Sequence, residues 1–380
     1  MTQFLSMPVD YALVGGGLQN GLLALAIRHH QPDARIVLVE REQRLGGNHT
    51  WCLHDSDVTP SAMAWLAPLI GHRWPGYSVH FDGFDRQVAL SYAAITSGRF
   101  HEVVHAAVLR GPGAVWLGAT AAGIGKHDVT LADGRVLRAR HVVCALGPER
   151  ADVPAATGWQ KFVGTEIVTT TPHGLTQPIL MDARVPQIDG FHFVYTLPLD
   201  ANRLLVEDTV FSDDATLQAD AMRSAALRYA RSQGWQVAAI VREERGVLPM
   251  PWGETPPTPQ QGPLLAGMQG GWFHPATGYS LAVAVRLADC VARDGDLAEL
   301  QGRHDRQARF ARKLNWALFR MAEPKHRNTM MSRFYRRPDE VIRRFFALDL
   351  HPTDAWRIVL GAPPRHMNWW PRTVVQEASP

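Results

Sequence analysis

Cysteines and long hydrophobic runs are scarce in this sequence, and each scarcity excludes a class of protein. The 380 residues include three cysteines, Cys52, Cys144 and Cys290, whose number and spacing match neither a disulfide framework nor a zinc site. The longest apolar runs are about half as long as a membrane-spanning helix. The N-terminus lacks the basic start of a signal peptide. We therefore expect a protein of the reducing cytosol with no helix that crosses a bilayer.

Several chemical signatures are missing as well. No cluster of His, Cys, Asp or Glu has the spacing of metal ligands, and no serine–histidine–aspartate arrangement is present. Internal repeats and low-complexity segments are also absent. What is present is a globular composition, 46% hydrophobic and 20% charged, in a chain too long for one core. Two or three substructures without a metal are therefore expected.

The feature that organises the chain is a glycine cluster between two apolar segments. Val9–Val14 has the length of a buried strand, Gly15–Gly17 follow, and Leu18–Leu25 continues as an apolar, helix-like segment. This order is typical of a dinucleotide-binding βαβ unit, in which the N–H groups at a helix N-terminus hold a pyrophosphate. The third glycine of the G-x-G-x-x-G fingerprint comes one position late, at Gly21 instead of Asn20. The fingerprint alone is therefore a weak signal.

Two later features strengthen this interpretation. Arg35–Glu40 reads as a second buried strand that ends in an acid 25 residues after Gly15, where a carboxylate suits the hydroxyls of a ribose. Gly46 and Gly47 follow in the next loop. An acid at a strand end with a glycine doublet just beyond it resembles flavoproteins that bind FAD. An ordinary strand–helix turn that uses glycine for its positive φ is the alternative.

The order of the expected elements predicts an α/β protein. It has an FAD-binding Rossmann-type domain, an inserted and mainly β substrate domain, and a helical C-terminal region. The pair Asp133-Gly134 predicts a hairpin, and the apolar strand His141–Gly147 after it returns to the first sheet. Period-two strands then surround one helix over Thr216–Gln233. We expect the FAD-binding domain at residues 1–72, 99–150 and 261–295, the substrate domain at 73–98 and 151–260, and the helical region at 296–380.

Four stretches together resemble the bacterial lycopene β-cyclases of carotenoid synthesis. They are Val14–Leu22, Leu45–Trp51, Leu204–Thr209 and Phe273–Leu281, and the likeness extends from residue 9 to about residue 285. The resemblance implies an enzyme that closes the ends of lycopene into β-rings, giving γ-carotene and then β-carotene. It also implies reduced FAD as cofactor, NAD(P)H as electron donor, and contact with other carotenoid enzymes.

The resemblance and the glycine-rich loops together indicate a set of cofactor-binding residues. These are Gly15, Gly17, Leu18, Asn20, Gly21, Glu40, Gly46, Gly47, Thr277 and Gly278. One departure concerns the place where flavoproteins commonly have Gly-Asp, with the acid on the ribityl chain. This chain has Gly267-Met268 there.

Glu207 and Asp208 are the catalytic candidates. Ring closure needs an acid that protonates an alkene and a base that removes a proton. Glu207 ends the apolar strand Leu204–Val206, where burial would raise the pKa of its carboxyl group and keep it protonated. The acidic motif of the family coincides with Glu207, and Asp208 is adjacent. The alternative is a strand-end acid that pairs with Arg203 or with a donor in the turn.

The basic charge is concentrated near the C-terminal end. Residues 303–344 hold 13 of the 39 Lys and Arg residues but 4 of the 36 Asp and Glu residues. Apolar residues recur there at helical spacing, as in Phe310, Leu314 and Leu318, and again in Val341, Ile342 and Phe345. A basic amphipathic helix suits an anionic membrane surface, and nucleic acid is a poor alternative because no binding motif is present. Packing of these apolar stripes on the protein body is the competing interpretation.

Two other functions are compatible with a flavin fold. One is an FAD- and NAD(P)H-dependent monooxygenase or dehydrogenase that acts on a lipophilic isoprenoid. The other is a carotenoid carrier without catalytic activity. For the leading interpretation we expect lycopene and γ-carotene as substrates and a location at the inner face of the bacterial membrane.

Overall fold

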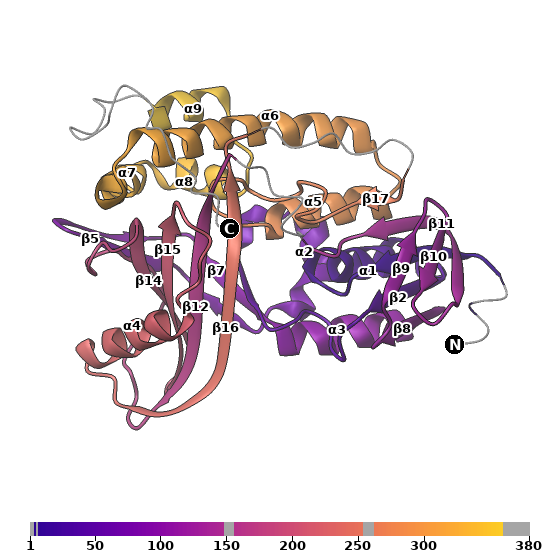
Figure 1. Cartoon of the computed structure of the whole chain (residues 1–380), viewed down its shortest axis with the longest axis horizontal. Coiled ribbons are helices and arrows are strands. Elements are labelled where there is room, and N and C mark those ends of the chain that lie inside the picture. The colour runs from indigo at the N-terminus through magenta and orange to yellow at the C-terminus, as the bar shows by residue number, and fades with distance from the viewer. Residues whose placement is uncertain (1–3, 5–6, 148–155, 254–261, 360–380) are drawn as a thin grey trace, which may run out of the picture.

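The computed structural model describes residue 4 and residues 7–147, 156–253 and 262–359. In this part of the chain, two sheets lie side by side and a layer of C-terminal helices covers both (Figure 1). The expected domain limits near residues 150 and 260, and the end of the C-terminal region at 360–380, lie outside the described residues.

The first sheet contains the glycine motif. Its strand order is β8-β2-β1-β11-β10-β9, and β17 pairs with β11. Strands β8, β2, β1, β11 and β17 run parallel, and β9 and β10 are antiparallel additions. Apolar runs form the central strands because parallel strands are covered on both faces. The bounds are β1 Val9–Val14, β2 Ile36–Glu40, β8 Gly113–Leu117, β9 Ala121–Ile124, β10 Asp128–Leu131, β11 Val136–Cys144 and β17 Leu264–Leu265.

Helices cover one face of this sheet, and on the other face side chains of β1, β2 and β8 pack with those of β10 and of the first half of β11. Residues 18–27 of α1 are all buried, so this helix lies inside the domain, between the sheet, α3 and α5. The hairpin at Asp133-Gly134 and the return of β11 beside β1 confirm two expectations from the sequence. The helices are α1 Leu18–His30, α2 Pro60–Leu66, α3 Ser97–Leu109 and α5 Leu281–Ala292.

The second sheet has the order β16-β12-β15-β14-β13-β5-β6 and is antiparallel except where β13 meets β5. Helix α4 packs on one face, where Ala226 and Tyr229 contact Val194, Leu204 and Val206. The helix starts three residues later than the sequence predicts. The bounds are β5 Tyr77–Phe81, β6 Phe84–Val88, β12 Thr157–Thr169, β13 Ile179–Asp182, β14 Phe191–Asp200, β15 Arg203–Ser212, α4 Ala219–Ser232 and β16 Val237–Pro251.

A small three-stranded sheet lies between the two large ones. Its order is β3-β7-β4, with β3 Thr50–His54, β4 His72–Trp74 and β7 Tyr92–Thr96. Strand β3 continues directly from the loop that holds Gly46 and Gly47. Side chains of β3 bond to both β14 and β16 of the second sheet. The glycine doublet is therefore a few residues from the surface of the substrate sheet.

The C-terminal helices are held by contacts with the body and with one another. They are α6 Leu297–Trp316, α7 Arg327–Phe334, α8 Asp339–Phe346 and α9 Pro352–Val359, and α6 contacts both α5 and β16 (Figure 1). Leu318, Ile342 and Phe345 are buried in the two main cores and Val341 is also buried, so the packing interpretation is right for these side chains. Within the described residues, none of the helices combines the length and apolar character needed to cross a bilayer.

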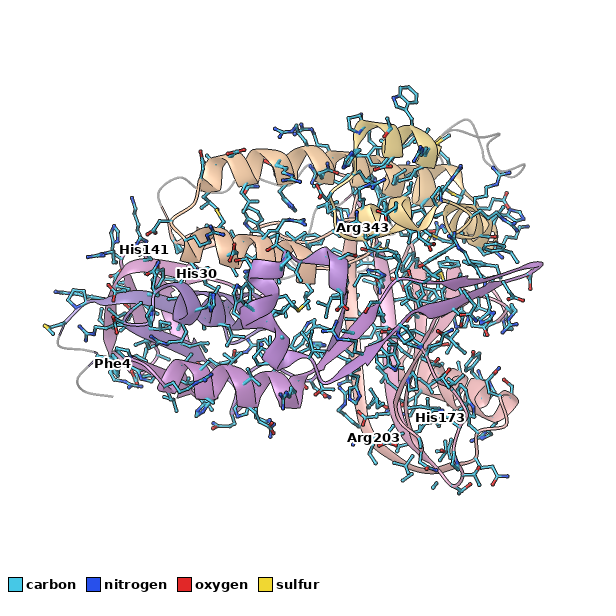
Figure 2. All side chains as sticks on the ribbon, turned by 180° about the vertical axis from the view of Figure 1, so that it is seen from behind. Phe4, His30, His141, His173, Arg203 and Arg343 are labelled. Carbon is cyan, nitrogen blue, oxygen red and sulfur yellow. The ribbon has the colours of Figure 1, made fainter. Side chains whose placement is uncertain are left out.

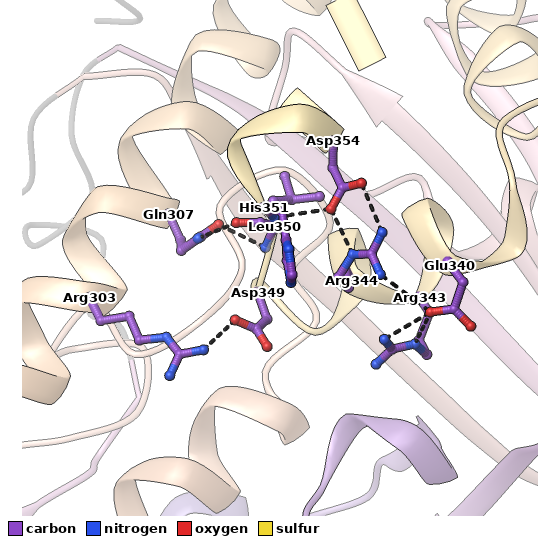
Figure 3. Close-up of polar contacts among 9 residues, drawn as sticks. All are labelled: Arg303, Gln307, Glu340, Arg343, Arg344, Asp349, Leu350, His351 and Asp354. Atoms are coloured by element: carbon purple, nitrogen blue, oxygen red, sulfur yellow. Dashed lines mark hydrogen bonds and ion pairs between the residues drawn. The ribbon is translucent and has the colours of Figure 1, made fainter. Parts of the chain in front are cut away.

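Many arginines of this region are paired with acids. Arg344 binds Asp354 through two hydrogen bonds of 2.6 and 2.8 Å, Arg343 binds Glu340, and Arg303 binds Asp349 (Figure 3). Arg343 lies on the helical layer, away from the lower end of the second sheet, where Arg203 and His173 lie (Figure 2). Much of the positive charge of residues 303–344 is thus neutralised locally.

Candidate functional site

The glycine turn between β1 and α1 leaves an open space at the N-terminus of the helix. Gly15 has a φ of +95°, and a Cβ there would lie 2.5 Å from the carbonyl oxygen of Ala145, so only glycine fits. Gly17 is the N-cap of α1, and a Cβ at Gly17 would meet nothing within 4 Å. The first turn of α1 has no acidic residue. This combination of open space, helix N–H groups without a side-chain cap and a first helical turn without an acid fits a pyrophosphate.

Glu40 and Gly46 converge on the same turn. The carboxylate of Glu40 accepts hydrogen bonds from the backbone N–H of Gly16 (2.6 Å) and of Glu42 (2.8 Å). The N–H of Gly46 donates to the carbonyl of Gly16 at 2.9 Å. The strand-end acid and the first glycine of the doublet therefore lie at the glycine turn, where the sequence places the cofactor.

The Asn20-Gly21 variant of the fingerprint has a structural cause. The buried side-chain amide of Asn20 donates to the carbonyls of Val14 and Gly15, both at 2.9 Å, and so braces the turn. A Cβ at Gly21 would lie 2.0 Å from the ring of Phe100 on α3. The close approach of α1 and α3 thus requires glycine at position 21. Leu18, also expected at the cofactor, is buried in the main core.

Gln19 is a residue that the sequence reasoning missed. It lies against Gly267, with 3.6 Å between its Cβ and the Cβ position of that glycine. Its Nε2 donates to the carbonyl of Ala284, but its buried Oε1 has no hydrogen-bond partner among the described residues. A buried acceptor without a donor is costly. Gln19 therefore offers an acceptor beside the position where related folds commonly have an acid.

Thr277 and Gly278 lie on the other side, where the loop before α5 meets the second sheet. A Cβ at Gly278 would lie 2.9 Å from Leu248 of β16 and 3.3 Å from Gln160 of β12. The hydroxyl of Thr277 accepts from the N–H of Tyr279 at 3.2 Å. These two residues are therefore part of the junction between the sheets rather than of the glycine turn.

Glu207 lies in the middle of the second sheet, on the face opposite α4. Its neighbours across the strands are Gly164 on β12 and Tyr195 on β14. Strand β3 passes over this row, since Thr50 bonds to Glu244 at 3.1 Å and Cys52 bonds to Tyr195 at 2.9 Å. The carboxyl group thus lies beneath the strand that leads away from the glycine doublet.

The surroundings of Glu207 favour its neutral form. Burial and the nearby carboxyl of Glu244 raise the pKa of Glu207 to about 8, despite a 3.0 Å hydrogen bond from Thr209. The alternative partner, Arg203, instead binds Glu166. Glu207 is therefore a protonated acid near neutral pH, which is what alkene protonation requires.

Neutral polar side chains lie next to Glu207. Cys52, Tyr195 and Tyr92 form a chain in which the two hydroxyls are 3.4 Å apart. Burial raises the pKa of the Cys52 thiol to about 12 and the pKa values of both tyrosines well above 10.0. These three hydrogen-bonded side chains are therefore uncharged near neutral pH. The sequence reasoning gave Cys52 no role in the site.

Asp208 points to the opposite face of the sheet, toward α4. Its carboxylate binds Nε2 of His192 at 2.6 Å, and Nδ1 of His192 binds the carbonyl of Pro186 at 2.7 Å. Burial lowers the pKa of His192, but the hydrogen bond and charge of Asp208 outweigh it and leave the pKa raised. The structure therefore separates the two adjacent acids.

Several other aromatic and histidine side chains belong to the core or the surface. Trp272 is buried and stacks on His304, and Phe191 is packed against Phe193 and Phe211. His274 is buried, binds the carbonyl of Phe345 at 2.9 Å, and has a pKa lowered by burial to about 3. His49 is exposed.

A cavity of about 970 Å³ opens where α6 meets both sheets. Its lining combines aromatic and basic side chains, among them Trp252, Trp272, Trp316, Arg309 and Lys313. Trp316 is 40% exposed. This opening has the mixed apolar and cationic character that suits a hydrophobic molecule arriving from an anionic surface.

Comparison with known proteins gives full-length matches. A family model described as "Lycopene cyclase protein" matches residues 10–370. The chain is 41% identical to a lycopene beta-cyclase of Pseudescherichia vulneris, over 93% of this chain and 94% of that protein. It is 38% identical to a lycopene beta-cyclase of a Paracoccus species, over 94% and 95%.

Solved structures share the fold at low sequence identity. A geranylgeranyl bacteriochlorophyll reductase-like protein of Thermoplasma acidophilum has a TM-score of 0.63 and 11% identity, covering 93% of this chain and 96% of the other. A p-nitrophenol 4-monooxygenase of Pseudomonas putida has a TM-score of 0.59 and 15% identity, covering 90% and 98%. The expected fold class, a Rossmann-type domain with a mainly β second domain and C-terminal helices, is confirmed.

Proposed function

Since the chain belongs to the lycopene cyclase family, we propose that it is a lycopene β-cyclase. In this proposal it closes both linear ends of lycopene into β-rings, with γ-carotene as the intermediate and β-carotene as the product. The observation that carries the proposal on the structural side is Glu207, a carboxyl group with a pKa of about 8 on the inner face of the second sheet. The relatives at 38–41% identity support it on the sequence side.

The reaction is a proton-catalysed isomerisation. Glu207 donates its proton to the terminal alkene, the resulting cation is attacked by the neighbouring double bond, and a carbon–carbon bond closes the ring. A proton then leaves the adjacent carbon and returns to the Glu207 carboxylate. Atoms and electrons of the substrate are unchanged in number. Thr209, which donates to one carboxyl oxygen, fixes the orientation of the acid.

FAD fits the site on three observations of the chain, and the reduced state is part of the proposal. The space at Gly17 suits its pyrophosphate, Glu40 lies at the strand end where a ribose is held, and the orphaned Oε1 of Gln19 is available to a ribityl hydroxyl. We include Gly15, Leu18, Asn20, Gly21, Gly46, Gly47, Thr277 and Gly278 in the cofactor-binding set, with Asn20 and Gly21 acting through the shape of the turn. When bound, the reduced flavin supplies an electron-rich ring that steadies positive charge, and NAD(P)H is the proposed source of its electrons.

Asp208 is proposed to act indirectly. Its ion pair with His192 lies on the far face of β15, so its contribution is to hold the strand that carries Glu207. The chain's residues at 73–98 and 151–260 are proposed as the substrate domain, because the strands on both sides of Glu207 come from them.

We further propose that the protein binds the inner face of the bacterial membrane through its C-terminal helices, where its substrates and other carotenoid enzymes are found. Exposed tryptophans support this, since Trp356 on α9 is 66% exposed and Trp316 borders the cavity. Flotation with anionic vesicles tests it. The expected result is binding that falls when both tryptophans are replaced by alanine, and unchanged flotation would contradict it.

Expression in a host that accumulates lycopene tests the main proposal. The unaltered chain should convert lycopene to β-carotene, and Glu207→Gln should leave lycopene in place, a loss of at least about a hundredfold because general acid catalysis is removed. Pigment analysis gives the readout. Untouched lycopene with the unaltered chain, or full ring formation by Glu207→Gln, would contradict the proposal.

A further inference from the structure

Glu244 lies on the same face of the second sheet as Glu207, on the other side of Gly164. In the strand register Gly164 of β12 pairs with Glu207 of β15 on one side and with Glu244 of β16 on the other. Directly paired residues of neighbouring strands point to the same face of a sheet. The side chains of Glu207 and Glu244 therefore point to the same face of the sheet, and only Gly164 lies between them.

Glu244 extends over that glycine. A Cβ at Gly164 would lie 2.9 Å from Cγ and 3.2 Å from Oε1 of Glu244. The side chain therefore covers the Cα of Gly164 and directs Oε1 across β12, toward the strand that carries Glu207. A methyl group at position 164 would displace Glu244 and would also press on Cδ1 of Leu205, 3.1 Å away.

The hydrogen-bond partners decide which of the two carboxyls is ionised. Oε2 of Glu244 accepts from Nη1 of Arg242 at 2.7 Å and from the hydroxyl of Thr50 at 3.1 Å. Glu207 accepts from the neutral hydroxyl of Thr209. A carboxyl bound to a guanidinium keeps its charge, and two like charges at close range do not both ionise. Burial raises the pKa of Glu244 as well, but the charge and hydrogen bond of Arg242 and the hydrogen bond of Thr50 oppose this rise, and Glu207 has no such partner. Glu244 thus carries the charge and Glu207 the proton.

The remaining groups that face Glu207 do not offset this charge. Cys52 of β3, Tyr92 of β7 and Tyr195 of β14 are neutral, and Asp208 points to the other face. Arg242 also binds Glu166 at 2.7 Å, so its single positive charge is shared between two carboxylates. Along the row of paired residues, Glu244 is the negatively charged side chain nearest to Glu207.

We propose that Glu244 is a positioning residue whose carboxylate, held over Gly164 by Arg242 and Thr50, keeps the acid Glu207 protonated at neutral pH. That the coupling between Glu244 and Glu207 serves catalysis rests on the proposed function. The coupling between the two carboxyls does not depend on it.

The pH dependence of cyclisation tests the proposal. Glu244→Gln removes the charge but keeps the size of the side chain, so the alkaline limb of the rate profile should move to lower pH by about one unit or more. The rate on the acidic side should stay near that of the unaltered protein. Glu244→Asp keeps the charge and should keep the limb close to its original position.

Glu243→Gln is the matched control. Glu243 is the residue just before Glu244 in β16. Its side chain points to the other face of the sheet and binds Arg223 of α4. Removing the charge of Glu243 should leave the alkaline limb of the rate profile at its original pH. If Glu244→Gln fails to fold, Gly164→Ala serves instead, since it displaces Glu244 and should also lower the limb. The proposal would be overturned if the alkaline limb of the Glu244→Gln profile stayed at the pH of the unaltered protein, or if Glu243→Gln shifted it by the same amount.

Infrared titration gives a readout that is independent of activity. The band of a neutral carboxyl that disappears in Glu207→Gln reports Glu207, and its titration midpoint should fall in Glu244→Gln. If this midpoint falls while the unaltered protein forms no rings, the coupling stands and the proposed function fails. If the unaltered protein forms rings and the midpoint does not move, the coupling is wrong.

Discussion

At the scale of residues, Glu207 and Asp208 show how strand alternation divides adjacent acids. Glu207 faces β3 and the small sheet, whereas Asp208 faces α4 and binds His192. The sequence marks both as one acidic motif, because a motif does not show which face each residue takes. Burial and the neighbouring Glu244 raise the pKa of Glu207, whereas Asp208 is bonded to His192 on the other face.

Asp208→Asn should change the pH dependence of stability. The raised pKa of His192 means that its protonated form is stabilised by folding, a contribution that is complete below the ordinary value of about 6.5 and is lost as pH rises through the folded-state value. The unaltered protein should thus lose part of its stability over this range, and Asp208→Asn should not. Urea denaturation from pH 5 to 9 measures this. Parallel curves for the two proteins would contradict the prediction.

At the scale of elements, the β1–α1 unit explains why the glycine fingerprint is shifted. Asn20 is inside the domain and braces two carbonyls of the turn, and Gly21 is where Phe100 packs. Gly17, in contrast, borders open space. The two glycines of the same turn therefore serve different purposes, one for packing and one for the cofactor.

Gly21→Ala and Gly17→Ala should separate these purposes. Gly21→Ala places a methyl group 2.0 Å from Phe100 and should lower the free energy of unfolding by about 2 kcal/mol or more. Gly17 has an extended backbone that alanine adopts, so Gly17→Ala should leave unfolding nearly unchanged but weaken FAD binding about tenfold or more because the methyl group occupies the pyrophosphate space. Thermal melts and flavin fluorescence titration measure the two effects. Equal effects of both variants on stability would contradict this.

Local elements could be predicted from the sequence, but the assembly around Glu207 could not. The apolar run of β1 and the Asp133-Gly134 turn have local signatures, and both are observed; the strand that carries Glu207 is observed too, but it continues to Ser212, so Glu207 lies in mid-strand and not at the strand end that the sequence predicted. Thr50 and Glu244 are 194 residues apart and meet only because β3 crosses the second sheet. Pairing across distant strands has no local signal, which is why Glu244, Thr50 and Gln19 were missed.

At the scale of the whole molecule, the C-terminal helices tie the two sheets together. Arg327 at the start of α7 is fully buried, donates to the carbonyls of Leu318 and Phe211, and binds Asp213 at 2.7 and 2.8 Å. It thereby joins the helical layer to the end of β15, the strand that carries Glu207. The basic composition of this region predicted a surface, but a part of it is structural.

Arg327→Leu should loosen this junction. The substitution leaves buried carbonyls and the Asp213 carboxylate without their donor, so the free energy of unfolding should fall by about 3 kcal/mol. Arg343→Leu, whose partner Glu340 is exposed, is the control and should cost less than about 1 kcal/mol. Chemical denaturation of both variants tests the difference, and similar losses would contradict the assigned role.

Cyclisation in heavy water tests the central claim most directly. If a carboxyl proton that exchanges with solvent between turnovers starts each ring closure, and no electrons are exchanged, mass spectrometry of the β-carotene formed by the purified, flavin-loaded protein should find one deuterium for each ring closed. Oxidation of NAD(P)H should not rise with the number of rings. Rings without deuterium, or one nicotinamide consumed for each ring, would contradict the account.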